Sequence, residues 1–134
     1  MGFEEVEHAA DRALRIFGTS LKELMVSAAQ GMTQLMVEDL SAISTEIEKS
    51  VRLQADDAES LLVEWLNELA YWAEAEMLVF KKIKISDLTA TRLEATVLGG
   101  KAAQLDKHIK AVTYHNLEII RTPKGLEATI VFDV

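Results

Sequence analysis

The sequence predicts an α+β fold in which two helices pack on a largely antiparallel sheet. Two stretches repeat apolar residues at three- and four-residue spacing, which is typical of amphipathic helices. The other stretches alternate apolar and polar residues, which favours strands. The chain has 134 residues, of which 49% are hydrophobic, and this length suits a single domain over residues 1–134 with one core.

The first helix is expected from Leu21 to Val37. Ser20 precedes it as a helix cap, and Glu23 follows three residues later, where it can return a hydrogen bond to the backbone. The apolar stripe consists of Leu21, Leu24, Met25, Ala28, Met32, Leu35 and Met36. Methionines at this spacing fill a core more often than they form an adaptable binding surface, so we assign them to the core.

The second helix is expected from Ala58 to Ala75, after the acidic capping sequence "DDAE". Its apolar stripe consists of Ala58, Leu61, Leu62, Trp65, Leu66, Leu69 and Trp72. Glu64 and Glu68 lie four residues apart on another side of this helix. That spacing suits a metal-binding pair, but no histidine accompanies the two glutamates, so a solvated helix face is the preferred interpretation.

Three strands with period-two alternation are expected before and after the second helix. They are "EIEKSVRLQ", with Ile47, Val51 and Leu53 on one face, "LVFKKIKI", from about Leu78 to Ile85, and "RLEATVL", with Leu93, Ala95 and Val97 on one face. Gly99 and Gly100 are expected to end the last of these strands.

The carboxyl-terminal part of the chain predicts an antiparallel hairpin. A strand "KAVTYHNLEI", from Lys110 to Ile119, is followed by the turn "TPKG" and a returning strand "LEATIVFDV". The face of the first strand that we expect to point to the core consists of Ala111, Thr113, His115, Leu117 and Ile119. We therefore interpret His115 as a buried, hydrogen-bonded residue and Lys110 as a surface lysine.

The composition excludes several classes of function. The chain has no cysteine, which excludes disulfides, thiolate zinc sites and cysteine nucleophiles. Neither a signal peptide nor an apolar run of membrane-spanning length is present, so we expect a cytoplasmic protein that does not enter a membrane. The net charge of −8 disfavours direct binding of RNA or DNA, and it suits a metal ion, a basic partner or solubility alone.

Carboxylates at the two ends of the chain are the candidate site. In "EHAAD", His8 and Asp11 lie at a strand break, where they can bind a metal or form a turn. Asp133 lies beside the terminal Val134, and hard cations such as Ca²⁺ and Mg²⁺ prefer oxygen ligands of this kind. If the first and last strands are neighbours, Asp11 and Asp133 can share one ion, with Lys110 near them, but sequence spacing does not establish that neighbourhood.

"EHAADRALRIFG", "SLLVEWLNELAY", "KAVTYHNLEI" and the terminal "FDV" together closely resemble the archease family, over nearly the whole chain from Phe3 to Val134. The resemblance implies a single archease-like α+β domain that is an accessory protein of an RtcB-type RNA ligase. That ligase joins RNA ends in tRNA splicing with GTP and a divalent metal. The resemblance implies that this protein promotes guanylylation and multiple turnover of the ligase, without itself being an enzyme or contacting RNA except through the ligase.

The resemblance also implies a set of site residues. The aspartate of the first motif, the aspartate near the carboxyl terminus and the carbonyl after it bind a divalent metal, typically Ca²⁺, with Mg²⁺ and Mn²⁺ as alternatives. These positions are occupied here by Asp11, Asp133 and Val134. We expect Lys110 and His8 to contact the active site of the ligase. The family usually has threonine where this chain has Ala9, which removes a hydroxyl near the metal but no ligand.

Three other functions remain open on the sequence. A general chaperone or scaffold would bind many unfolded clients and would not depend on Asp11 or Asp133. A metal-dependent hydrolase of small phosphate esters would turn over alone, with His8 as the only clear general base. A ligand-binding module would use a pocket between helices and sheet, and a small molecule would stabilise it against heat.

Overall fold

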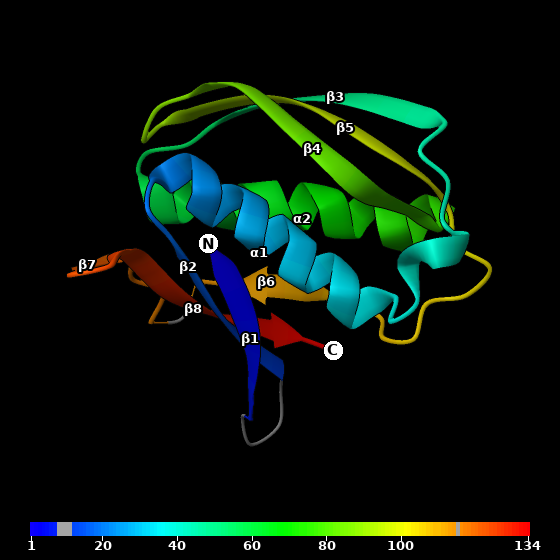
Figure 1. Cartoon of the computed structure of the whole chain (residues 1–134), viewed down its shortest axis with the longest axis horizontal. Coiled ribbons are helices and arrows are strands. Elements are labelled where there is room, and N and C mark those ends of the chain that lie inside the picture. The colour runs from blue at the N-terminus through cyan, green and yellow to red at the C-terminus, as the bar shows by residue number, and fades with distance from the viewer. Residues whose placement is uncertain (8–11, 115) are drawn as a thin grey trace.

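The computed structural model describes residues 1–7, 12–114 and 116–134, and it confirms the α+β class. Within these ranges, two helices lie between two antiparallel sheets, one of five strands and one of three (Figure 1). The sequence predicted one sheet, and the second covers the opposite side of the helix pair. The elements are β1 (Gly2–Glu7), β2 (Arg12–Gly18), α1 (Leu21–Met36), η1 (Leu40–Ala42), β3 (Ile47–Gln54), α2 (Ala58–Glu76), β4 (Leu78–Leu88), β5 (Arg92–Lys101), β6 (Ala111–Thr113), β7 (Ile120–Thr122) and β8 (Gly125–Asp133).

Both helices form within one residue of the predicted ends. The Ser20 hydroxyl accepts the Glu23 N–H at 3.2 Å, and Asp57 accepts the Ser60 N–H at 2.7 Å, so each helix begins at a side-chain cap. The α2 helix ends at Met77, whose φ of 56° is left-handed. Such a residue lets the backbone turn away while its N–H still bonds a helix carbonyl.

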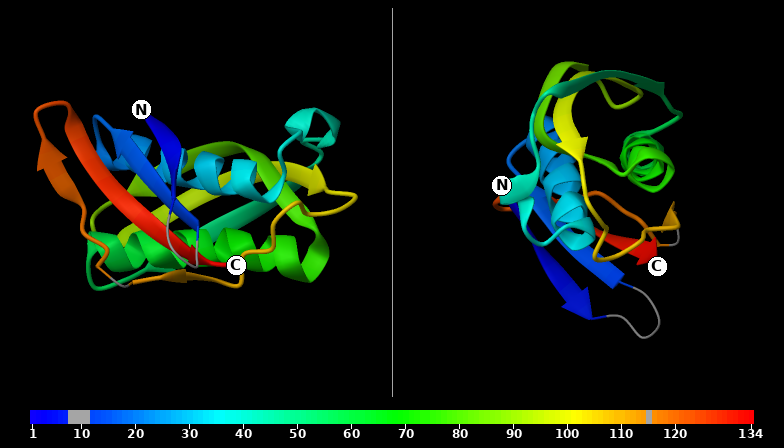
Figure 2. Two further views of the ribbon diagram at one scale, coloured as in Figure 1. Left: turned by 90° about the horizontal axis from the view of Figure 1, so that it is seen from below. Right: turned by 90° about the vertical axis from the view of Figure 1, so that its right-hand side faces the viewer.

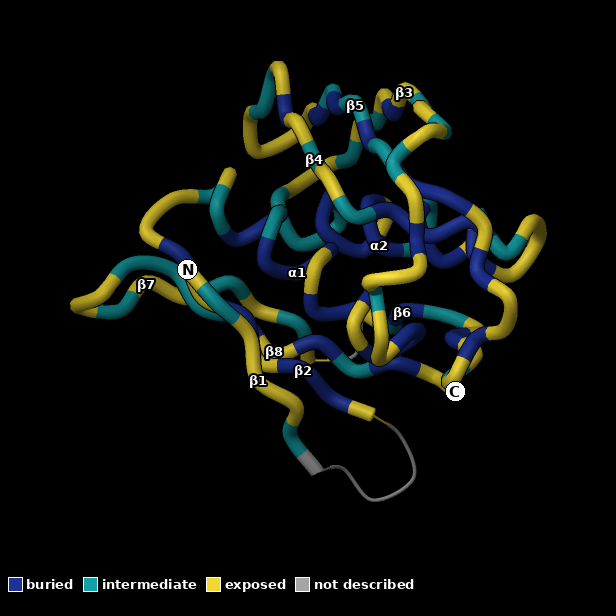
Figure 3. Tube along the Cα trace, turned by 45° about the vertical axis from the view of Figure 1, so that its right-hand side comes forward, coloured by how far each residue is buried: buried dark blue, intermediate teal, exposed yellow. Residues whose placement is uncertain are grey.

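The core lies where the two helices meet the inner faces of the sheets. Met25, Met32 and Met36 are buried, which confirms that the methionines fill the core. Trp65 is fully buried, and its indole N–H donates to the Met25 carbonyl at 2.9 Å, joining α2 to α1. Figure 3 shows the helices largely buried and β1 largely exposed. No helix in the described ranges is long and apolar enough to cross a membrane.

The five-stranded sheet follows the order β1-β2-β8-β6, and β7 also pairs with β8. All of these pairs are antiparallel. The central strand β8 has β2 on one side and β6 on the other, with Phe132 opposite both Arg12 and Val112. The residues after β8 therefore lie beside the start of β2 and the start of β6.

The three-stranded sheet follows the order β3-β5-β4. The prediction that Gly99 and Gly100 end a strand was wrong, because β5 continues through both to Lys101. A Cβ atom on Gly99 would clash with the Val79 carbonyl oxygen of β4. This glycine thus permits a close backbone approach inside the sheet, which is the other common role of glycine in a strand.

The strand predicted from Lys110 to Ile119 was also wrong in length and in face. Only Ala111–Thr113 forms β6, and the Leu117 N–H then donates to the Tyr114 carbonyl at 3.0 Å in a turn. Asn116 has a φ of 56°, a left-handed conformation that asparagine tolerates. In β6 the buried residue is Val112, which the prediction placed on the solvent-facing side of the strand. His115 lies outside the described residues. The predicted hairpin at the turn is confirmed, but its first strand is β7 (Ile120–Thr122), which begins after the predicted strand ends.

Candidate functional site

The candidate site lies at one end of the five-stranded sheet, where β8 ends and β6 begins. We call Lys110, Asp133 and Val134 the tip. The Lys110 N–H donates to the Asp133 carbonyl oxygen at 2.8 Å, and Ala111 lies opposite Asp133 in the β6–β8 register. All three tip residues are exposed. Pairing of β6 with β8 therefore brings the candidate lysine to the candidate carboxylate across 22 intervening residues of sequence.

The tip has the donor atoms that a hard cation prefers. Asp133 is exposed, and within the described ranges no cation and no hydrogen-bond donor pairs with its carboxylate. The Val134 carbonyl follows directly in the chain. These oxygens fit Ca²⁺ or Mg²⁺, which take several carboxylate and carbonyl ligands. The described residues contain no group of three or more His, Cys, Asp or Glu side chains that could hold a metal ion. By itself the tip therefore supplies some, but not all, of the ligands that a cation needs.

Asp11 and His8 lie outside the described residues, as do Ala9 and Ala10 between them. The structure does place Arg12, the residue that follows Asp11, opposite Phe132, the residue that precedes Asp133. The condition set by the sequence was that the first and last strands are neighbours. It does not hold for β1, which neighbours β2, whereas the second strand, β2, pairs with β8 along its whole length.

The cation nearest to this site on β2 is already engaged. The Arg12 guanidinium donates to the Glu5 carboxylate of β1 at 3.0 Å, and both side chains are about half exposed, at 48% and 44%. Exposed pairs of this kind contribute little stability. Arg12, which directly follows the "EHAAD" motif, is therefore already paired with Glu5. Among the described residues, Lys110 is the cation that belongs to the tip.

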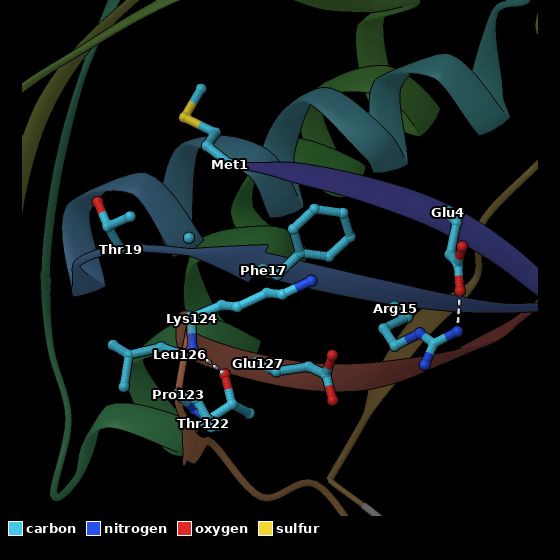
Figure 4. A pocket seen from close by; sticks show the side chains of 11 residues that line it. Met1, Glu4, Arg15, Phe17, Thr19, Thr122, Pro123, Lys124, Leu126 and Glu127 are labelled. Carbon is cyan, nitrogen blue, oxygen red and sulfur yellow. Dashed lines mark hydrogen bonds and ion pairs between the residues drawn. The ribbon is translucent and has the colours of Figure 1, made fainter.

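A groove of about 570 Å³ lies at the opposite end of the same sheet. Figure 4 shows Phe17 and Arg15 of β2, Glu4 of β1 and the turn residues around Lys124 lining it. Arg15 donates to Glu4, and this hydrogen bond together with the negative charge of Glu4 raises the pKa of Arg15. The groove is thus large enough for a small ligand, yet none of the site residues predicted from the sequence lines it.

Two polar groups next to the tip were given no role by the sequence analysis. The Asn67 side-chain oxygen on α2 accepts the Val112 N–H of β6 at 3.0 Å. The Thr113 hydroxyl of β6 is buried and, within the described part of the chain, has no hydrogen-bond partner. Asn67 interrupts the apolar run "SLLVEWLNELAY", which was the available signal, but sequence alone does not say which backbone group it binds.

Comparisons with known proteins agree on one family. The model of the Archease protein family (MTH1598/TM1083) matches residues 3–134. The chain is 35% identical to the protein archease of Methanosarcina acetivorans, over 98% of this chain and 95% of that protein. It is similar in structure to protein 1598 of Methanobacterium thermoautotrophicum, with a TM-score of 0.80, 29% identity and 99% of each chain covered. The Thermotoga maritima archease, described as a possible chaperone, has the same fold, with a TM-score of 0.67, 24% identity and coverage of 98% of this chain and 96% of that one.

Proposed function

Because this chain belongs to the archease protein family, we propose that it is an accessory protein of an RtcB-type RNA ligase in tRNA splicing. In this role it promotes guanylylation of the ligase by GTP and so allows multiple turnover, while the ligase itself joins the RNA. The family resemblance of the four sequence motifs supports this function. The observation that carries it is the tip, where β6 and β8 bring Lys110 and Asp133 together.

The proposed metal site uses the side chains of Asp11 and Asp133 and the carbonyl of Val134. Two features support it. The Asp133 carboxylate has no partner among the described residues, and Arg12, which follows Asp11, lies one row from Asp133 in the β2–β8 register. Asp11 adjoins Arg12 in the chain, and adjacent Cα atoms are about 3.8 Å apart, so we propose that the two aspartates share the ion at this edge of the sheet. The bound ion, with Ca²⁺ as the first candidate, would supply positive charge at this edge.

The proposed encounter with the ligase is electrostatic. The chain has a net charge of −8, and a ligase that binds GTP and RNA presents a basic pocket. Complementary charge of this kind raises the association rate and the specificity more than the affinity. Lys110 is exposed beside Asp133, and we propose that it contacts phosphate oxygens or carboxylates in the active site of the ligase, with His8 as a second contact.

A ligation time course with the cognate ligase and excess RNA tests this function. We expect ligation to stop near one turnover without this protein and to continue with it. Asp133→Asn should abolish the stimulation and weaken Ca²⁺ binding by more than about tenfold, since even indirect partners of metal ligands change affinity by that much. Glu118→Gln is a matched control, because Glu118 is an exposed carboxylate beyond the β6 strand.

Two outcomes would contradict the proposal. The first is a matched ligase that turns over equally well with and without this protein. The second is equal stimulation by the wild type and by Asp133→Asn. If the protein instead suppresses aggregation of unrelated unfolded proteins independently of Asp133, it is a general chaperone. Release of phosphate from a small ester by the isolated protein would indicate the hydrolase.

A further inference from the structure

The α2 helix holds the segment that leads into and out of β6 at three separate points. The helix and the segment run antiparallel, side by side (Figure 2). The three contacts are Glu74 Oε1 to His108 Nδ1 at 2.9 Å, Asn67 Oδ1 to the Val112 N–H at 3.0 Å, and Glu59 Oε2 to the Ile119 N–H at 3.0 Å. Successive α2 residues in this series are seven or eight positions apart, about two helical turns, so they lie on one stripe of the helix.

The contact between Asn67 and Val112 provides a hydrogen bond that a neighbouring strand would otherwise provide. Among the described strands, β6 pairs with β8 and with no other, and its Val112 N–H points away from β8 toward α2. Val112 is 5% exposed, so this N–H is shielded from water. A buried donor without a partner costs much more than a typical hydrogen bond contributes. The Asn67 oxygen satisfies this donor and thereby fixes how far β6 lies from the helix.

The same strand sets the geometry of the tip. Ala111 lies opposite Asp133, and the Lys110 N–H donates to the Asp133 carbonyl. A displacement of β6 would move the Lys110 side chain and release that carbonyl. We infer that Asn67 is a positioning residue for the tip, acting through Val112 on Lys110 and Asp133. This inference rests on the proposed function for its consequence, although the positioning itself is a property of the fold.

The other two contacts do not share this role. Glu59 holds Ile119, which follows the turn after β6 and precedes β7. Glu74 and His108 are both exposed, with side-chain exposures of 39% and 60%, so their pair is screened by water. Of the three, Asn67 alone binds a backbone group within the three residues of β6. Glu59 therefore provides a control of the same type, at the same helix surface but outside β6.

Amide hydrogen exchange of the full chain, followed by NMR, measures the positioning directly. Asn67→Leu keeps the size of the side chain and removes the acceptor, whereas Asn67→Asp restores an acceptor oxygen. We expect Asn67→Leu to speed exchange at Val112 and Lys110 by roughly fivefold or more, the equivalent of one ordinary hydrogen bond. Asn67→Asp should restore the wild-type rates. Glu59→Leu should speed exchange at Ile119 and leave Lys110 unchanged.

Ca²⁺ titration of the same samples, read from the Asp133 and Val134 amide signals, gives the second readout. We expect severalfold weaker Ca²⁺ binding in Asn67→Leu, recovery in Asn67→Asp and no change in Glu59→Leu. Unchanged Lys110 exchange in Asn67→Leu, or equal changes in Asn67→Leu and Glu59→Leu, would overturn the positioning role. If the wild type binds no Ca²⁺ and stimulates no ligase, the proposed function fails, and Lys110 exchange still decides the role of Asn67.

Discussion

The two ends of the five-stranded sheet differ in how their charges are balanced. At the groove end, Glu4 and Arg15 pair across β1 and β2, and the space they line is about 570 Å³. At the tip, about 13 Å along β8 from the residue opposite Arg15, Asp133 and Lys110 are exposed, and within the described ranges neither side chain has an ionic partner. A cavity indicates where a ligand has room, whereas an exposed charge with no partner among the described residues is one that a binding partner can pair with. The tip is the end that we propose to be functional.

The largest expected difference between the two ends is in the free energy of unfolding, because the phenylalanine near each end is buried to a different extent. Phe132, which precedes Asp133 of the tip, is fully buried, whereas Phe17 in the groove is 38% exposed. Phe132→Ala should lower the free energy of unfolding by about 3–5 kcal/mol, and Phe17→Ala by about 1 kcal/mol. Urea denaturation followed by tryptophan fluorescence measures both. Similar losses in the two variants would show that the tip is not anchored to the core as described.

Two exposed lysines give the next comparison. Lys110 lies at the tip and Lys124 lies in the turn that lines the groove. Lys110→Ala should reduce ligase stimulation at least about fivefold, the effect of losing a contact worth about 1 kcal/mol. Lys124→Ala has the same change of charge and should leave stimulation unchanged. Multiple-turnover ligation assays with both variants decide this, and a reduction by Lys124→Ala alone would move the functional surface to the groove end.

The smallest expected effect is a loss of stability at low pH, caused by Glu23 near the groove end. Glu23 accepts the Thr19 N–H beside the groove, and this hydrogen bond lowers the pKa of Glu23 below its ordinary value of 4.5. A carboxylate with a lowered folded pKa contributes stability that is fully present above its unfolded pKa and is lost as the pH falls through its folded pKa. The melting temperature should therefore drop below about pH 4.5, and Glu23→Gln should flatten part of that drop. Identical pH profiles for the two proteins would contradict this assignment.

Local patterns predicted the helices well and the strands less well. The caps at Ser20 and Asp57 and the apolar stripes are properties of short segments, so the helix ends came within one residue of the structure. Period-two alternation does not show where a strand loses its neighbour. It therefore extended β6 to Ile119, although a turn at Tyr114–Leu117 ends it, and it treated Gly99 as a break rather than a close contact.

The sequence by itself determined the α+β class, the two amphipathic helices, the family and the residues proposed for the site, because composition, periodicity and motif are all carried by residue order. The tertiary structure alone decided that the helices lie between two sheets and that β8 lies between β2 and β6. It also decided that Lys110 bonds Asp133 and that Asn67 binds β6. These are contacts between distant segments, and burial and backbone hydrogen bonding select them only when the whole chain folds.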